Sequence, residues 1–451
     1  MGGNAFPVFT PRMRPEAYRA IRDLCQKKLR DLFVVVATPI EGPAKADHGD
    51  IDVLAVWNRD ELFQTPEQAT SSPSLKEQKE AAYRALGANL SKSEQPHTIS
   101  YAVPWPKEVP IEKAVLEVNK PVYIQVDLHI CPSLSNLQWM LFRDGHGDMW
   151  NLLGSTIRPF GLTVDGYGLY IRIPEIENDD RKKARVLLSS DSEDVLHFLG
   201  LKIDKEFWDK PFDSEQDLFE YAATCRLFWV RSNNPDASLD DNHDSEVGDL
   251  DVEDNRVLGA DMRKINSKVG TRVKQRAVFK RWFKEFLPAC RASGRYPSTP
   301  PLTRDEVREL AFQNFPAASS TYYSTLKKWR VEKQRISLWK EVIKPAIPAY
   351  LESSRRSCCA AALKKIILND DTSFDGIVAP SDLKDSNGFF DEALVSAWVG
   401  KAWSTVLDVS WRKNQERYAA SKERKAALKR TGSGEEISIT KNDITKDCKM
   451  N

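Results

Sequence analysis

The sequence predicts an α+β protein in which a small mixed sheet with helical cover is followed by mainly helical segments. Within the first 135 residues, three runs rich in aliphatic and β-branched residues, at 33–37, 50–56 and 120–130, alternate with segments of helical periodicity. From 303 to 429 the apolar spacing is mainly helical. The chain has 451 residues and 41% hydrophobic content, enough for two or three domains with a real core.

Composition narrows the classes of function. The formal net charge is +1, so no global field favours nucleic acid or a membrane. No apolar run approaches the roughly eighteen residues of a membrane helix, and the N-terminus has no apolar signal region. The seven cysteines form no Cys-x-x-Cys motif or Cys/His cluster, which argues against structural zinc. We therefore expect reduced thiols, a cytoplasmic or nuclear location and no contact with a membrane.

The elements of the first 135 residues follow from local patterns. Residues 1–15 are rich in Pro and Gly and predict an extended arm. A helix is predicted over Pro15–Leu32, because Pro15 suits a first turn and apolar residues recur at helical spacing. The other elements expected here are a strand at Phe33–Ala37, a strand ending at Val56, a helix capped by Ser74, a short strand at Thr98–Val103 and a longer strand at Lys120–Ile130.

Two aspartates lie side by side on the strand that ends at Val56. Residues i and i+2 of a strand point to the same face, so Asp50 and Asp52 project together. Asp127 lies in a similarly apolar strand, and the three carboxylates converge if that strand lies beside the first. Clustered carboxylates repel one another, and a divalent cation removes the repulsion. The alternative is that Asp50 and Asp52 are ordinary polar residues on a solvent-exposed face of the sheet.

A glycine-containing loop, an Asp-x-Asp pair on a strand and a third acid on a later strand resemble the DNA-polymerase-beta-like nucleotidyltransferase superfamily. The resemblance covers about residues 30–135. Gly42-Pro43 takes the position of the family's Gly-Gly or Gly-Ser turn. Gly2-Gly3-Asn4 is another candidate for that turn, but a whole helix separates it from the acid pair, so we prefer Gly42. Pro43 departs from the family pattern, because proline has no N–H to donate to a nucleotide phosphate.

The resemblance implies a nucleotidyltransferase fold and transfer of a nucleoside monophosphate from a nucleoside triphosphate (NTP) to an acceptor hydroxyl. It implies Mg²⁺ or Mn²⁺ as cofactor, with Asp50, Asp52 and Asp127 as catalytic residues and metal ligands. We expect Gly42 to form the turn at the nucleotide, Gly49 to allow close approach of backbone or of the nucleotide, and Lys45 to meet the triphosphate. The acceptor stays open between an RNA end, a small molecule and a protein.

The remaining chain is divided by composition. We predict a catalytic domain at 1–135, a substrate lobe at 136–232, an acidic, mobile linker at 233–256, a helical C-terminal region at 257–430 and a disordered tail at 431–451. The substrate lobe is expected to contain a helix at Leu134–Phe142, an element at Met149–Ile157, a hairpin within Phe160–Ile173, a helix at Ser190–Leu199 and a helix at Ser214–Trp229.

Two other functions stay open. Pro43 and the nearly neutral charge fit a catalytically inactive binding protein that keeps the nucleotidyltransferase fold. Basic residues between 263 and 284, and again between 422 and 430, fit a helical scaffold that binds RNA or another nucleic acid, although solvated basic helix faces also have this composition. The sequence gives no indication of oligomeric state.

Overall fold

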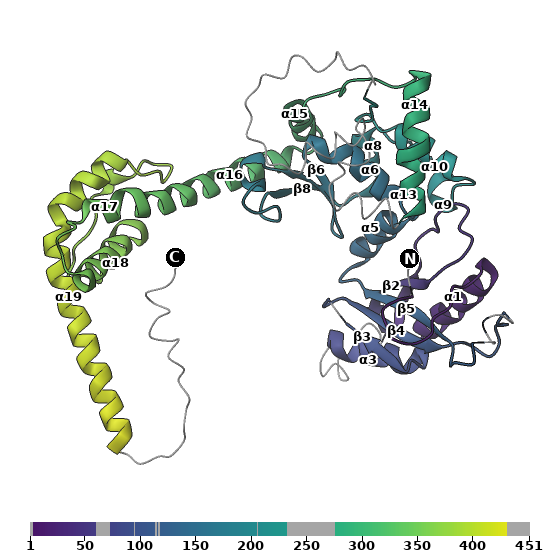
Figure 1. Cartoon of the computed structure of the whole chain (residues 1–451), viewed down its shortest axis with the longest axis horizontal. Helices are drawn as coiled ribbons and strands as arrows, with labels where there is room; N and C mark the ends of the chain where they lie inside the picture. The colour runs from purple at the N-terminus through teal and green to yellow at the C-terminus, as the bar shows by residue number, and fades with distance from the viewer. Residues whose placement is uncertain are drawn as a thin grey trace. The chain divides into compact units, whose positions relative to one another are not determined.

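The computed structural model describes residues 3–59, 73–93, 95–112, 115, 118–204, 206–231 and 276–430. The protein is mixed α+β, which confirms the predicted class, and contains a five-stranded mixed sheet and a three-stranded sheet (Figure 1). It divides into two compact units, Met1–Tyr323 and Ser324–Asn451, and each is described by itself.

The five-stranded sheet holds both predicted acidic strands and has the order β1-β2-β5-β4-β3. The strands are β1 (Phe33–Ala37), β2 (Asp50–Asn58), β3 (Leu90–Lys92), β4 (Thr98–Pro104) and β5 (Tyr123–Ile130). β2 and β5 pair in parallel, and the other neighbouring strands pair antiparallel. The parallel pair confirms the prediction that the strand with the third acid lies beside the strand with the acid pair.

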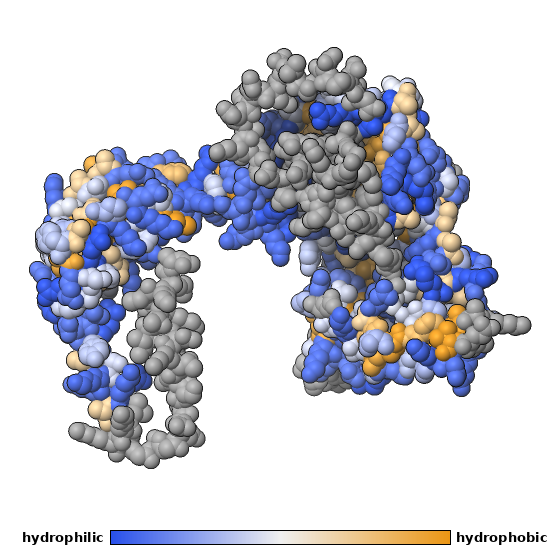
Figure 2. Space-filling view, viewed as in Figure 1, coloured by the Kyte–Doolittle hydropathy of each residue, from blue (hydrophilic) through white to orange (hydrophobic). Residues whose placement is uncertain are grey.

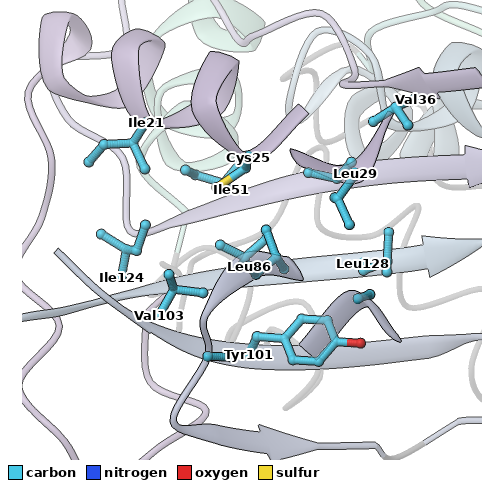
Figure 3. Packing of buried hydrophobic residues seen from close by; sticks show 14 of the residues in the cluster. Ile21, Cys25, Leu29, Val36, Ile51, Leu86, Tyr101, Val103, Ile124 and Leu128 are labelled. Carbon is cyan, nitrogen blue, oxygen red and sulfur yellow. The ribbon is translucent and has the colours of Figure 1, made fainter. Parts of the chain in front are cut away.

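Two helices, α1 (Pro15–Leu29) and α3 (Leu75–Leu86), pack on one face of this sheet. Figure 3 shows side chains of α1 above side chains from β2 and β5. The buried cluster includes Ile21, Cys25, Leu29, Ile51, Leu86, Tyr101, Ile124, Val126 and Leu128. Alternate residues of the strands supply this core, as period-2 side-chain alternation requires. We call this side of the sheet the apolar face.

Local signals set the ends of these two helices. Ser74 and Glu77 form the capping box that starts α3, so the predicted cap is confirmed. Gly87 ends α3 in the left-handed conformation at φ 70°. α1 ends at Leu29, three residues before the predicted end, where the Arg30 N–H donates to the Gln26 carbonyl and a turn leads into β1.

The opposite side of the sheet is covered along only part of its length. Helix α5 (Leu134–Asp144) packs on Leu54 and Val56, in the C-terminal half of β2, through side chains that include Leu137 and Met140. Asp50 and Asp52 precede these residues on the same side of β2. We call the side that carries the aspartates the acid face.

The predicted extended arm, residues 3–13, runs against the sheet. Phe9 forms an isolated parallel bridge with Val122, and Met13 forms an antiparallel bridge with His48. Two backbone hydrogen bonds, 2.7 and 2.8 Å long, join Met13 and His48. Residues from the start of the chain therefore lie beside the strands that carry the acids.

The rest of the first unit forms a second lobe around the three-stranded sheet β6-β7-β8. The predicted hairpin within 160–173 is present as β6 and β7. Helix α10 ends at Ala223 rather than at the predicted Trp229, because the chain turns at Thr224 and the Arg226 N–H then donates to the Leu199 carbonyl. The elements are α6 (Met149–Ile157), η1 (Arg158–Phe160), β6 (Leu162–Val164), β7 (Leu169–Arg172), α7 (Pro174–Glu177), β8 (Arg185–Ser189), α8 (Ser192–Leu199), α9 (Glu206–Asp209) and α10 (Glu215–Ala223).

Helices from beyond residue 275 also belong to this unit. Phe219 of α10 packs its ring against Trp282 and Phe286, with ring centroids 5.4 Å apart in both pairs. The elements are α13 (Ala277–Arg281), the π-helix η4 (Trp282–Phe286), α14 (Leu287–Ser293), α15 (Arg304–Asn314) and the first part of α16 (Pro316–Ser337).

The second unit is helical, as the spacing in 303–429 predicts. Its elements are the end of α16, the π-helix η5 (Leu338–Ile343), α17 (Lys344–Ala346), α18 (Ser353–Asn369), η6 (Ser381–Leu383) and α19 (Glu392–Arg430). α18 and α19 share an apolar core that includes Leu363, Ile366, Val395 and Val399. The visible surface of both units is mostly hydrophilic (Figure 2), and no helix in the described ranges is long and apolar enough to cross a membrane.

Some predictions fall on residues outside the described ranges. These are the acidic linker at 233–256, the tail at 431–451 and the basic residues between 263 and 274.

Candidate active site

The register of the sheet brings the three predicted acids together on the acid face. In the parallel pair of β2 and β5, Asp52 lies opposite Asp127 and Asp50 lies opposite Gln125. Residues directly opposite each other in a ladder point to the same side of the sheet. Ser100 of β4 lies opposite Asp127 on its other side. Asp50, Asp52 and Asp127 therefore lie at neighbouring positions on the acid face, although about seventy-five residues separate the pair from the third acid.

The pKa of Asp52 is raised by burial and by the neighbouring carboxylates. The pKa of Asp52 is raised to about 7, first because the surrounding protein displaces water and then because of the charges of Asp50, Asp127 and Asp144, while the charge of Lys45 opposes the shift. Part of the Asp52 side chain stays open to solvent. Asp50, Asp127 and Asp144 are therefore near enough to Asp52 for their negative charges to disfavour its ionised form.

Asp127 is held by neighbours on its own strand and the next one. The Gln125 amide donates to both oxygens of Asp127, at 3.0 and 2.9 Å. Burial raises the pKa of Asp127, whereas hydrogen bonds from Ser100 and Gln125 lower it and the charge of Asp50 raises it. The third acid therefore has a set orientation, in contrast to a carboxylate that is free in water.

Asp50 and Asp52 face a cavity of about 870 Å³. Its walls come from the loop before β2, the end of α5 and the turn after it, α6, β6, α10 and α13. The basic side chains in its lining are Lys45, Arg143, Arg158, Arg276 and Arg281, and the acidic ones are Asp50, Asp52, Asp144, Asp148 and Glu215. A cavity with cations beside a carboxylate pair suits a polyanion that brings a divalent cation with it.

Some of these cations are paired within the cavity wall. Arg276 donates to Asp148, and Arg281 forms a two-contact pair with Glu215. Both arginines lie beyond residue 275, so a distant part of the chain closes the cavity. Lys45 lies in the loop that leads to β2 and lines the same cavity as Asp50 and Asp52, and its positive charge lowers the pKa of Asp52.

Gly42 lines the cavity and also packs against the turn after α5. A Cβ on Gly42 would lie 3.6 Å from the Gly147 Cα, and a Cβ on Gly147, which has φ +63°, would lie 3.2 Å from the Gly42 Cα. The His146 N–H donates to the Ile40 carbonyl at 2.9 Å. The two loops therefore touch through their backbones, and the close approach that glycine allows here is between parts of the protein.

The structure places Gly49 beneath the N-terminal arm, and it is not among the residues that line the cavity. A Cβ on Gly3, which has φ +87°, would lie only 2.7 Å from the Gly49 carbonyl oxygen. Gly3, which has no Cβ, makes this close contact possible, so backbone of the arm lies against Gly49. Gly3 belongs to the glycine pair that we set aside because a helix separates it from the acids, yet the fold brings it next to them.

The two histidines near the acids, His48 and His129, interact with neighbouring side chains of the protein. His48 is buried, stacks on the Tyr18 ring with centroids 3.7 Å apart, and has its Nε2 3.5 Å from a Glu41 carboxylate oxygen. Burial lowers the pKa of His48 to about 4, so this imidazole is neutral near pH 7. His129, on the acid face, shares a 2.9 Å hydrogen bond between its Nδ1 and the Thr98 hydroxyl.

Patterns in the sequence did not assign Asp144, Gln125, Arg143, Arg276 or Arg281 to the site. Asp144 is the last residue of α5 and immediately precedes Gly145, so its position in the sequence indicates only the end of a helix. Gln125 precedes Asp127 by two, and the same period-2 argument that paired the aspartates could have found it. No local signal links Arg276 or Arg281 to the site, because their place depends on long-range packing.

The residues on the acid face fit a magnesium or manganese ion by donor chemistry. Carboxylate oxygens are the ligands that these hard cations prefer. Each ionised carboxylate offers about four lone-pair sites, so Asp127 keeps capacity beyond its bonds from Gln125 and Ser100. In the described part of the chain, however, no group of three or more His, Cys, Asp or Glu residues is already arranged to hold a metal ion. Asp50 and Asp52 face the cavity, and Asp127 is not part of its lining.

Comparison with protein-family models and with curated proteins finds no match for this chain.

Proposed function

We propose that the protein is a metal-dependent nucleotidyltransferase, which moves a nucleoside monophosphate from an NTP to an acceptor hydroxyl. The observation that carries the proposal is the parallel register of β2 and β5, which sets Asp127 opposite Asp52 beside a cavity lined with basic side chains. A mixed sheet with the acid pair on a strand next to the third acid also supports assignment of residues 1–135 to the nucleotidyltransferase fold.

Asp50 and Asp52 are the residues that would hold Mg²⁺ or Mn²⁺, with Asp127 sharing an ion on the acceptor side. When bound, such ions neutralise phosphate charge and lower the pKa of the attacking hydroxyl. Lys45 attracts the triphosphate into the cavity. Asp127, whose pKa is raised by burial, accepts the proton of the acceptor hydroxyl. Catalysis on this account depends on position and charge.

The cavity has room for a nucleotide and for part of an acceptor. Its volume of about 870 Å³ lies toward the upper end of the roughly 300–1,000 Å³ range of small-molecule sites. The acceptor class stays open between an RNA end, a small molecule and a protein. Binding of RNA or another nucleic acid through the basic C-terminal helices is part of the same proposal for the RNA case, as is a cytoplasmic or nuclear location.

A second candidate is a nucleotide-binding protein without transferase activity. Two observations favour it. The Gln125 amide donates to both oxygens of Asp127 and so reduces the number of lone pairs left for a metal, and Pro43 has no N–H to offer a phosphate at the turn. On this reading the cavity binds NTP with a divalent cation, and no chemistry follows.

Incubation with each NTP labelled at the α-phosphate tests the proposal. The protein is mixed with Mg²⁺ or Mn²⁺ and, in separate reactions, with total cellular RNA, total protein or a small-molecule extract. We expect label in one acceptor fraction together with released pyrophosphate, and loss of both with Asp52→Asn. Asp47→Asn is the matched control, because Asp47 lies in the same loop region but pairs with Arg12 at the surface.

The same reactions separate the two candidates. Metal-dependent NTP binding without any label transfer would support the binding protein. Absence of both NTP binding and transfer would reject both candidates.

A further inference from the structure

We propose that Gln125, held by the main chain of the N-terminal arm, is a positioning residue that orients Asp127 for its part in metal binding. This inference rests on the proposed function and adds to it a residue on β5 and the arm, residues 3–13.

Gln125 has a single favourable orientation. Its side chain is 6% exposed, its Nε2 donates to the two Asp127 oxygens at 3.0 and 2.9 Å, and its Oε1 accepts the Ala5 N–H at 2.9 Å. A flipped amide would set Oε1 against carboxylate oxygens and Nε2 against a backbone donor. Both contacts would be repulsive, and water has little access to the buried Gln125 amide to relieve them. The Ala5 N–H therefore dictates which end of the amide faces Asp127.

The arm is anchored on both sides of Ala5. Before it, Gly3 packs against the Gly49 carbonyl and accepts a hydrogen bond from the Thr10 hydroxyl. After it, the Phe9 carbonyl accepts the Tyr123 N–H at 3.0 Å. Tyr123 lies two residues before Gln125 on β5. The donor that orients Gln125 is consequently fastened to the same strand that carries Gln125 and Asp127.

Contact from one amide to both carboxylate oxygens sets the rotation of the carboxylate about its Cβ–Cγ bond. It also leaves lone-pair sites of Asp127 for a cation, because the amide takes only one site on each oxygen. A carboxylate without this contact would rotate and would be buried with fewer partners. Removal of such an outer partner typically weakens metal affinity by about 10–100-fold.

Mn²⁺ titration followed by the electron paramagnetic resonance of free Mn²⁺ tests the inference on the full-length protein. We expect Gln125→Leu to weaken Mn²⁺ binding by about 10–100-fold. Ala5→Pro removes the backbone donor without changing the sequence of β5, although proline also restricts the backbone of Asn4 and of position 5. We expect a loss in the same direction even if Gln125→Leu folds poorly. Thermal unfolding without metal checks that each variant is folded.

One control matches the glutamine substitution. Gln26→Leu removes a half-buried glutamine that donates to Thr38, away from the acids, and should bind Mn²⁺ like the wild type. Gln125→Leu should cause no further loss when Asp127 is already Asn, since Gln125 acts through Asp127.

The outcomes separate the two proposals. Wild-type Mn²⁺ affinity in Gln125→Leu and Ala5→Pro, or an equal loss from Gln125→Leu in the Asp127→Asn background, would overturn the positioning role and leave the proposed function standing. Failure of the wild-type protein itself to bind Mn²⁺ would reject the proposed metal site, and the positioning role with it.

Discussion

The two faces of β2 and β5 are made by alternate residues of the same strands and have opposite effects on stability. On the apolar face, Ile51 and Leu128 are fully buried under the helical cover. On the acid face, the neighbouring Asp52 and Asp127 have raised pKa values, because burial and mutual repulsion disfavour their ionised forms. The apolar face stabilises the fold. The acid face lowers the stability of the metal-free protein, so the presence of its carboxylates is explained by a function and not by folding.

This contrast is informative because both faces depend on one register. A slip of one residue between β2 and β5 would turn the aspartates into the core and the aliphatic residues out of it. The apolar face therefore sets the register, and the register sets Asp52 opposite Asp127. Substitutions on the two faces should separate folding from function.

The largest expected effect is on transfer activity. Asp52→Asn keeps the shape of the side chain and removes its charge, so we expect nucleotide transfer to fall by about 10²–10³-fold. Without metal, the same variant should be more stable than the wild type, because one repelling charge is gone. Single-turnover assays and thermal unfolding in a chelator measure the two quantities. Lower metal-free stability would contradict the assigned repulsion.

Truncation on the apolar face should act in the opposite way. Leu128→Ala leaves a cavity in a closed core, so we expect a loss of about 2–5 kcal/mol in the free energy of unfolding. Denaturant unfolding measures it. Where enough protein stays folded, kcat per folded molecule should stay near that of the wild type. A loss of kcat as large as that of Asp52→Asn would show that the two faces are not separable.

A smaller effect is expected from the positive charge beside the acid pair. Lys45→Ala should raise KM for NTP by about tenfold, or about 1.4 kcal/mol, and change kcat less, because Lys45 contacts the triphosphate on this account. Steady-state kinetics with the NTP identified by labelling measure both constants. A drop in kcat alone, with KM unchanged, would assign Lys45 a different role.

The pH dependence of metal-free stability should give the smallest effect, because Asp52 is partly open to water. Its pKa rises from 3.8 to about 7 on folding, so the folded state binds this proton more tightly. Its contribution to stability is complete below about pH 4 and is lost as pH rises to about 7. His48, whose pKa falls from 6.5 to about 4, adds stability that is lost as pH falls over about the same range.

The difference between wild type and Asp52→Asn isolates the first contribution. Thermal unfolding in a chelator from about pH 5 to about pH 8 should show the variant gaining on the wild type as pH rises. A constant difference across that range would contradict the raised pKa of Asp52.

Local patterns in the sequence predicted much of the sheet. The alternation around Asp50 and Asp52, the aliphatic run at β5 and the Ser74 cap each carry their signal within a few residues. Pairing of β2 with β5 followed from the family resemblance and is present in the structure. These features depend on short-range geometry, which a sequence displays directly.

The parts that sequence reasoning missed depend on contacts between distant residues. Gly3 of the arm lies against Gly49, although helix α1 separates them in the sequence. Arg281, from beyond residue 275, lines the cavity. Separation along the chain led us to set Gly3 aside, although the fold brings it beside the acid strand. Gln125 carries no motif, and its role shows only when both of its hydrogen-bonding partners are in place.

The central claim is that the acid face holds a divalent cation, and thermal stability at increasing Mg²⁺ concentration tests it most directly. Binding to the folded state alone raises stability by an amount that grows with ligand concentration. We predict that the wild-type melting temperature rises steadily with Mg²⁺ and rises less in each of Asp50→Asn, Asp52→Asn and Asp127→Asn. A wild-type melting temperature that does not respond to Mg²⁺, or an equal rise in the variant that lacks all three carboxylates, would contradict the account.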